Sequence, residues 1–328
     1  MGYAKTTRLG WIALTAVGFC LFLARMALGQ LPAALLQTRY LQIHYPAGEE
    51  RAAQALAQSA DLLCAKVLAD LGSTPTHRVR VALATDLAQM QAFAPAGVRV
   101  ASWMAGLAIQ GENLILLRIR TASAGPDPLE RVFLHEWAHL ALAQAVAGRP
   151  LPHWFQEGFA MLESGDWSFD RARTLAAGVL AQRLFSLEAL GETFPQKLGD
   201  IELAYAQSID FIGFLQATYG RTAFHRLLEL LTQGEPFLDA LEEACDDGLF
   251  AIEDEWRRQL RVRFTWIPVL TGAGTVWFFA SLVFLAAYLR KSRKKRAAIA
   301  QMEDNPADDL LERAEDPPES DPPPDELG

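Results

Sequence analysis

The sequence has few cysteines and no surplus of positive charge, and each shortage excludes a class of protein. Three cysteines occur in 328 residues, and Cys20 lies in an apolar N-terminal run, which leaves Cys64 and Cys245 for the main body. Two cysteines cannot form the disulfide framework of a small secreted scaffold, so we interpret them as separate buried thiols, with a pair as the alternative if this region is exported. The formal net charge of -9 provides no basic surface for phosphates, so nucleic acid is not an expected partner.

The negative charge is concentrated at the C-terminus. Residues 301–328 carry eleven acids and one base, so the rest of the chain is close to neutral. This stretch is also rich in proline and has no aromatic residue. Such a composition cannot bury enough apolar area to offset the entropy lost on ordering. We therefore interpret residues 290–328 as a basic and then acidic, disordered cytoplasmic tail, whose acidic part has a cytoplasmic binding partner as one possible role.

Charged residues are also missing from a run near the N-terminus. Residues 9–24 contain none, and Lys5 and Arg8 precede them. A basic start, a short apolar centre and small residues after it are typical of a secretory signal. We therefore predict that residues 1–29 form a signal peptide or, if they are not cleaved, a signal anchor.

A second run without charge, residues 264–289, is 26 residues long and is followed by six basic residues between Arg290 and Arg296. About 20 apolar residues suffice to cross the hydrocarbon core of a bilayer, and clusters of lysine and arginine stay on the cytoplasmic side. The sequence therefore predicts a transmembrane helix in the cytoplasmic (plasma) membrane with a cytoplasmic C-terminus. Residues 30–262 are then extracytoplasmic or periplasmic, and the lipid bilayer is an expected partner through one or two segments.

The main body is predicted to be an α+β domain, with a small mixed sheet followed by a helical half. Segments in which apolar and polar residues alternate, or which are rich in β-branched residues, favour strands. Apolar residues at helical spacing favour helices. From residue 155 to about 259 the pattern is almost entirely helical. The strand-like segments are residues 40–45, 78–83 and 113–119, and the two earlier helical segments are residues 49–71 and 129–146.

A five-residue motif in the predicted helix at 129–146 carries candidate metal ligands. It reads His135-Glu136-Trp137-Ala138-His139. Residues four apart project from the same helix face, so the two imidazoles can bind one ion, while Glu136 points about 100° away toward a water on that ion. The surrounding residues are largely apolar, and polar groups in such a helix need a partner, which a metal supplies.

A catalytic zinc site has three protein ligands and one open position, so a third ligand is needed. Glu157 is the candidate, because it lies at the start of the next helical segment, 18 residues after His139. A loop around residues 148–152 would let that helix return and present the carboxylate to the metal. We interpret the nearby His153 as a loop residue rather than a ligand. A structural zinc site is disfavoured, because such sites normally close with four ligands, often cysteines.

The two motifs resemble those of the gluzincin zinc metallopeptidases, the thermolysin-like and aminopeptidase-like enzymes, and most closely the small bacterial peptidase-MA-like domains. The resemblance covers about residues 38–262, and it implies a metallopeptidase domain at 30–262 that hydrolyses a peptide or protein substrate. It includes four further segments, residues 103–106, 115–119, 204–208 and 254–257.

By motif position, the resemblance implies that His135, His139 and Glu157 bind Zn²⁺. It also implies that Glu136 is the general base that activates a water for peptide hydrolysis. The wider family tends to carry an acid one helical turn after the third ligand, which orients a ligand histidine. Met161 occupies that position here, so Glu163 or another acid is expected to replace it.

Peptide hydrolysis places negative charge on the carbonyl oxygen, which needs a hydrogen-bond donor opposite the metal. Tyr205 is the candidate for this catalytic donor and His225 is the second choice, although a core tyrosine and a surface histidine are the ordinary alternatives. The strand at 114–119 is expected to form the edge of the sheet beside the cleft, where an extended peptide could pair with its backbone.

Two classes of function fit these motifs. The first is a membrane-anchored zinc peptidase, and the alternative is a catalytically inactive membrane receptor or scaffold that retains the fold. The complete motif favours the enzyme, because a binding module has no use for Glu136. An aminopeptidase would need an acid to anchor the amino terminus of its substrate, and none is identified, so endopeptidase and aminopeptidase activity both stay open.

Overall fold

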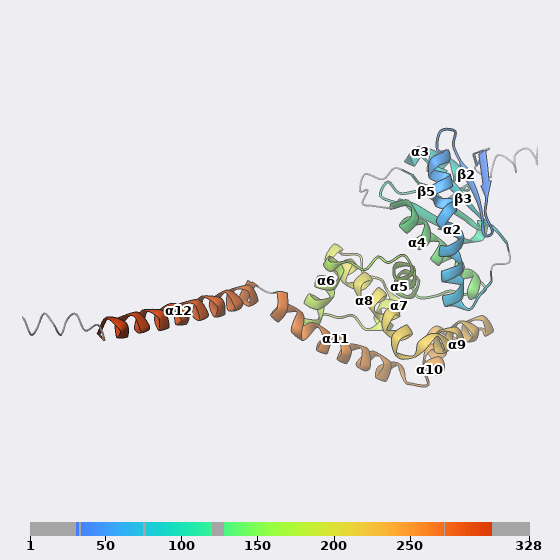
Figure 1. The fold of residues 1–328 in the computed structure, drawn as a ribbon. Helices are drawn as coiled ribbons and strands as arrows, with labels where there is room; N and C mark the ends of the chain where they lie inside the picture. The colour runs from blue at the N-terminus through green and yellow to red at the C-terminus, as the bar shows by residue number, and fades with distance from the viewer. Residues whose placement is uncertain (1–30, 33, 75–76, 120–127, 272, 304–328) are drawn as a thin grey trace, which may run out of the picture. The chain divides into compact units, whose positions relative to one another are not determined.

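The structure, a computed structural model, describes residues 31–32, 34–74, 77–119, 128–271 and 273–303 (Figure 1). The predicted signal segment at 1–29 and residues 304–328 of the predicted tail lie outside these residues. The chain divides into two compact units, Met1–Val262 and Arg263–Gly328. The first unit contains the described strands and the candidate site.

The first unit begins with a small mixed sheet, as the sequence predicts, and this sheet has five strands, of which the sequence predicts three. Its strands are β1 (Ala34–Gln37), β2 (Leu41–Tyr45), β3 (Val79–Ala84), β4 (Gly106–Ile109) and β5 (Leu114–Arg118). Their order in the sheet is β1-β2-β3-β5-β4. β3 pairs in parallel with both β2 and β5, whereas β1 and β4 pair antiparallel with their neighbours. Ile43, Val81 and Ile115 align across the three central strands and are fully buried.

The edge of the sheet is not where the sequence analysis expects it. The strand predicted at the edge corresponds to β5, which lies between β3 and β4, so that prediction is wrong and β4 is the edge strand. Four of the five residues of β5 are buried, whereas those of β4 are only half-buried. A strand covered on both faces is a continuous apolar run, and this explains why β5 gives the clearest strand signal in the sequence.

Helices cover both faces of the sheet. Leu114 and Leu116 of β5 belong to a buried cluster with Met90 and Phe93 of α3 (Leu87–Phe93). Alternate residues of a strand point to opposite faces, so Leu117 points to the other face. There α2 (Glu50–Leu71) and α4 (Pro128–Ala145) pack against the sheet and against each other. α4 is therefore held directly beside the edge strand β4.

Beyond α4 the first unit is helical, which confirms the predicted α+β class. Its helices are α5 (His153–Glu163), α6 (Phe169–Leu180), α7 (Leu187–Glu192), α8 (Leu198–Thr218), α9 (Gly220–Gln233), α10 (Phe237–Cys245) and α11 (Leu249–Thr271), which continues past Val262. α5 packs against both α4 and α8. Gly158 permits the close approach to α8, because a Cβ at this position would lie 2.5 Å from the carbonyl oxygen of Ser208.

The two cysteines of the main body are separate thiols, as predicted. Both are free, and Cys64 is buried in α2 as predicted, whereas Cys245 at the end of α10 is only half-buried. Burial raises the pKa of the Cys64 thiol, and burial together with the charge of Asp247 raises the pKa of Cys245 to about 11. Neither thiol is therefore a nucleophile at neutral pH.

The second unit contains α12 (Ala273–Glu303). The membrane helix predicted at 264–289 is divided between α11 and α12, with Gly272 outside the described residues. Within the ranges that the structure describes, no helix has the length and apolar character needed to span a bilayer. α12 nevertheless exposes many large apolar side chains, which are Trp277, Phe278, Phe279, Leu282, Val283, Phe284, Leu285, Tyr288 and Leu289.

Candidate metal centre

The candidate metal centre begins with the two histidines of α4. Phe133, Trp137 and Leu140 follow one another at helical spacing and are buried, so they hold one face of α4 in the core. His135 and His139 project from a different face, one turn apart, with ring centroids separated by 4.7 Å. Their Nε2 atoms lie 3.1 Å from each other, so both nitrogens are directed to one position.

The loop after α4 and the packing of α5 bring Glu157 to the same position. The chain leaves α4 through a left-handed turn at Ala147 and Gly148, which have φ angles of 51° and 71°. α5 then packs against α4. Glu157 Oε1 lies 3.6 Å from His139 Nε2, and Glu157 Oε2 lies 3.9 Å from His135 Nε2.

These three side chains fit a zinc ion. One ligand atom from each of His135, His139 and Glu157 lies within 4.8 Å of the other two, and a tetrahedral zinc with bonds of about 2.0–2.1 Å holds its ligand atoms roughly 3.3 Å apart. Burial lowers the pKa of His135, and burial followed by the neighbouring histidines lowers the pKa of His139 to about 3. Both imidazoles are therefore neutral at pH 7, which is the form that binds a metal.

Glu136 lies on a neighbouring face of α4 and is held by the edge strand. The backbone N–H of Ala108 in β4 donates a 2.8 Å hydrogen bond to Glu136 Oε2. Gly106 allows this approach, because a Cβ there would lie 2.6 Å from Glu136 Cγ. Burial raises the pKa of Glu136 to about 7; the Ala108 hydrogen bond opposes this shift and Glu157 adds to it. A carboxyl group with such a pKa can accept and return a proton at neutral pH.

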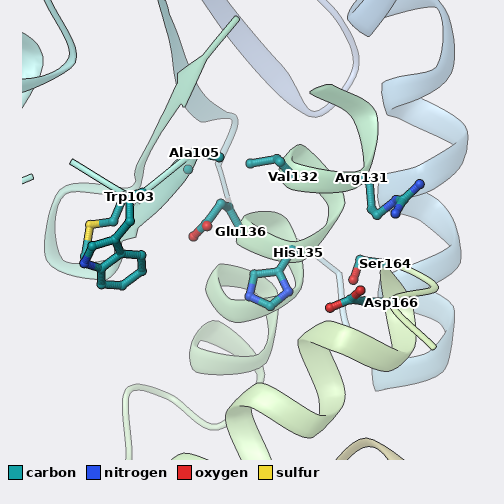
Figure 2. Close-up of a pocket in the computed structure, with 10 residues that line it drawn as sticks. Trp103, Ala105, Arg131, Val132, His135, Glu136, Ser164 and Asp166 are labelled. Carbon is teal, nitrogen blue, oxygen red and sulfur yellow. The ribbon is translucent and has the colours of Figure 1, made fainter. Parts of the chain in front are cut away.

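A cavity of about 270 Å³ lies beside these residues. In Figure 2, Glu136 and His135 extend from α4 toward it, Trp103 lies on one side, and Ser164 and Asp166 lie near His135 on another. Trp103 is 78% exposed, so the cavity wall combines an accessible aromatic surface with charged groups. The lining residues are Trp103, Met104, Ala105, Gly106, Arg131, Val132, His135, Glu136, Ser164 and Asp166.

The structure places Tyr205 and His153 near the centre. The Tyr205 ring on α8 lies 5.1 Å from Phe194 and 6.5 Å from His153, measured between centroids. Burial, followed by the negative charge of Glu157, raises the pKa of Tyr205, so its hydroxyl group stays protonated and can donate. His153 is not the loop residue that we predict from the sequence. It begins α5, and its Nδ1 lies one helical turn from Glu157, 3.8 Å from Oε1.

Two other predictions are wrong. His225 does not belong to the centre, because its Nε2 lies 3.0 Å from the carbonyl oxygen of Asp70 in the last turn of α2, where helix carbonyls lack partners. Glu163 does not orient a ligand histidine either. It is buried at the end of α5, with Oε2 2.7 Å from Lys66 Nζ of α2. Since each helical residue turns by about 100°, a residue six positions after Glu157 points in a different direction.

Asp166 is an acid in the cavity wall near His135 that no sequence motif marks. It lies in the turn after α5 and lines the cavity with His135. Burial lowers the pKa of that histidine, and the charge of Asp166 opposes the shift. Arg171 of α6 forms an ion pair of 2.5 Å with Asp166, and its charge also opposes the rise that burial causes in the pKa of Glu157. No motif marks this pair, because a turn brings it to the site.

The mixed sheet, the motif helix α4 and the carboxylate on α5 together define a gluzincin-type, peptidase-MA-like domain. The family model described as the Peptidase MA superfamily matches residues 57–262, which is more than half of the chain. The chain belongs to the Peptidase MA superfamily, as the sequence predicts. No curated protein matches it.

Solved structures similar to the chain include variants of M1 zinc metallopeptidases. A two-domain M1 zinc metallopeptidase variant bound to L-tryptophan is 20% identical, with a TM-score of 0.36. An M1 zinc metallopeptidase variant from Deinococcus radiodurans is 20% identical, with a TM-score of 0.35, and one bound to a Tyr-Ser-Ala substrate is 21% identical, with a TM-score of 0.32. Each alignment covers 70% of this chain and 50% of the other, so the chain spans about half the length of these proteins.

Proposed function

We propose that this protein is a membrane-anchored zinc peptidase. The observation that carries the proposal is the convergence of His135, His139 and Glu157 within 4.8 Å, beside a glutamate held in the cavity wall. These three residues would hold Zn²⁺. When bound, zinc supplies Lewis-acid polarisation of the scissile carbonyl and makes a water more acidic. Membership of the Peptidase MA superfamily supports peptide hydrolysis as the reaction.

Glu136 acts as the general base. Its Oε2 accepts the Ala108 N–H, which leaves Oε1 for the attacking water. The carboxylate takes a proton from that water and then passes it to the leaving amine, and a pKa of about 7 suits both transfers. This arrangement also favours an enzyme over an inactive receptor or scaffold, because a binding module gains nothing from a buried, aligned carboxylate.

Two further groups act on the substrate. β4 is the edge strand of the sheet and its first residue, Gly106, lines the cavity, so an extended peptide can align along it by backbone pairing. Tyr205 donates a hydrogen bond to the carbonyl oxygen as negative charge develops there. Removal of one such donor typically costs about 10²–10³ in kcat.

Residues 264–289 anchor the protein in the cytoplasmic membrane. The support is the absence of charge over this segment, the basic residues from Arg290 to Arg296, and the large apolar side chains exposed along α12. Contiguous apolar surface of this kind is rare on proteins in water and marks a contact with protein or membrane. The basic cluster then places the C-terminus in the cytoplasm and the peptidase domain on the other side.

The proposal is tested with the full-length, zinc-loaded protein and a mixed peptide library analysed by mass spectrometry. We expect cleavage that a chelator abolishes and added zinc restores. The His139→Ala variant should cleave nothing, whereas His77→Ala, which removes an exposed histidine outside the centre, should cleave as the wild type does. A wild-type protein that binds one zinc per chain and cleaves no peptide would contradict the proposal.

A further inference from the structure

The acids around the cavity are all assigned to a partner or a role. Glu157 belongs to the metal centre and Glu136 is the general base. Asp166 is paired with Arg171, with 2.5 Å between Oδ2 and Nη2. Among the described residues that line the cavity or form the metal centre, each acid therefore already has a partner or a role. The ammonium group of a substrate's amino terminus would therefore have to compete with Arg171 for Asp166.

Arg171 keeps hydrogen-bond donors for a ligand, although its charge is paired with that of Asp166. Its side chain is 25% exposed, and one amino group contacts Asp166. No other side-chain partner of Arg171 is found in the described part of the chain. The remaining N–H donors of its planar guanidinium group are therefore available to a ligand. A guanidinium group binds a carboxylate through two parallel hydrogen bonds, which makes it selective for that group.

Arg171 is linked to the cavity by its contact with Asp166, which lines the cavity together with His135. Its charge acts on His135, Glu157 and Tyr205, which come from three different helices around the metal centre. A second cation, Arg131, lies one helical turn before His135 and lines the cavity directly. Arg131 in the cavity wall and Arg171 behind Asp166 can therefore both act on a substrate group that enters beside the general base.

Arg171 is also held in place before any substrate arrives. Its backbone N–H donates to Ser168 Oγ, which caps the start of α6, and its side chain is tied to Asp166. A side chain that is already ordered loses little entropy when it binds a ligand, so more of the interaction contributes to affinity.

We propose that Arg171, held by Asp166, is a specificity-determining residue that binds a carboxylate of the substrate next to the scissile bond. This carboxylate is either the C-terminus of a short peptide or the side chain of an aspartate or glutamate. A free amino terminus is disfavoured at the same position. The inference rests on the proposed peptidase function and adds a substrate class to it.

The test uses full-length, zinc-loaded protein and peptides in matched pairs. In one set, the two peptides of a pair end in a free C-terminal carboxylate or in an amide. In the other set, they have aspartate or asparagine near the cleaved bond. Comparison of the two sets identifies which carboxylate Arg171 binds. In at least one set, we expect kcat/KM to be about tenfold or more higher for the acid. Arg171→Gln should abolish this preference, and Arg173→Gln should keep it, because Arg173 is exposed on the same helix and pairs with Asp170.

Peptide binding separates a failure of this inference from a failure of the peptidase function. In a Glu136→Gln background, calorimetric affinities for the same pairs should show the same dependence on Arg171. If the wild type cleaves both members of every pair equally, or if Arg171→Gln keeps the preference, the inference is wrong while the peptidase function remains. If nothing is cleaved, the binding preference alone decides the inference. Arg171→Lys keeps the charge but lacks the planar set of N–H donors, so it should show an intermediate preference for the acid. This variant replaces Arg171→Gln in the test if the glutamine variant fails to fold.

Discussion

At the scale of single residues, the position of Glu136 depends on the lack of a side chain at Gly106. We predict that Gly106→Ala lowers kcat by about 10–100-fold, because the added methyl group would lie 2.6 Å from Glu136 Cγ and displace the carboxylate. Zinc affinity should not change. Gly111→Ala is the matched control, since a Cβ there meets no atom within 4 Å. Steady-state kinetics and zinc titration of both variants check the prediction, and a fully active Gly106→Ala variant would refute it.

Tyr205 gives a second prediction at this scale. Tyr205→Phe keeps the ring that packs on Phe194 and removes only the hydroxyl group. We expect kcat to fall by about 10²–10³ while zinc binding is retained, because the hydroxyl donates to the developing oxyanion. Tyr219→Phe, at the other end of α8 with its hydroxyl near Asp247, should have little effect. Unchanged kcat in Tyr205→Phe would make Tyr205 a packing residue.

The sequence predicts some of these residues and not others for a physical reason. His135 and His139 share a helix face by their spacing alone, and Glu157 follows a short loop, so local geometry suffices to find all three. Asp166 reaches the cavity through a turn whose direction no local pattern encodes. His225 was a wrong second choice, because its environment depends on the packing of α9 against α2, which local sequence does not reveal.

At the scale of elements, α2 and α5 are joined by a partly buried ion pair. Glu163 is 5% exposed and contacts Lys66, whose side chain is 55% exposed. We predict that Lys66→Met lowers the free energy of unfolding by about 1–3 kcal/mol at pH 8, less than for a fully buried pair because Lys66 is half in water. Arg183→Met removes an exposed partner of Asp200 and should cost under about 1 kcal/mol.

The effect of Lys66→Met should depend on pH. Burial raises the pKa of Glu163, and Lys66 opposes that rise, so the variant has a higher pKa still. A folded state that binds the proton more tightly than the unfolded state loses stability as pH rises through the folded pKa. The penalty should therefore be small below the unfolded pKa of about 4.3 and full at pH 8. Urea unfolding at pH 4 and pH 8 measures it, and a difference independent of pH would count against the ion pair.

The element β4 shows why the sheet edge was assigned incorrectly. Its four residues begin with Gly106 and are only half-buried, so neither length nor alternation marks a strand in the sequence. β5 has a strong apolar pattern because it is interior, so the strongest strand signal in the sequence does not mark the strand at the edge. The helices were easier to predict, since periodic apolar faces extend over many residues.

At the scale of the whole molecule, the sequence predicts an α+β domain of the right family, while the anchor remains a proposal. We predict that the full-length protein stays in the membrane fraction after alkaline carbonate extraction, because residues 264–289 lack charge. A variant without residues 264–289 and with its N-terminal segment cleaved should be soluble. Extraction of the full-length protein by carbonate would contradict the anchor. Protease treatment of sealed vesicles tests the predicted orientation.

The central claim, a zinc peptidase with Glu136 as its general base, is tested most directly by the cleavage rate of one peptide at equal zinc occupancy. We predict that Glu136→Gln binds zinc as the wild type does and that its kcat is lower by about 10²–10⁴. Glu192→Gln, an exposed glutamate on α7, should retain the wild-type rate. A Glu136→Gln variant that cleaves as fast as the wild type would contradict the account.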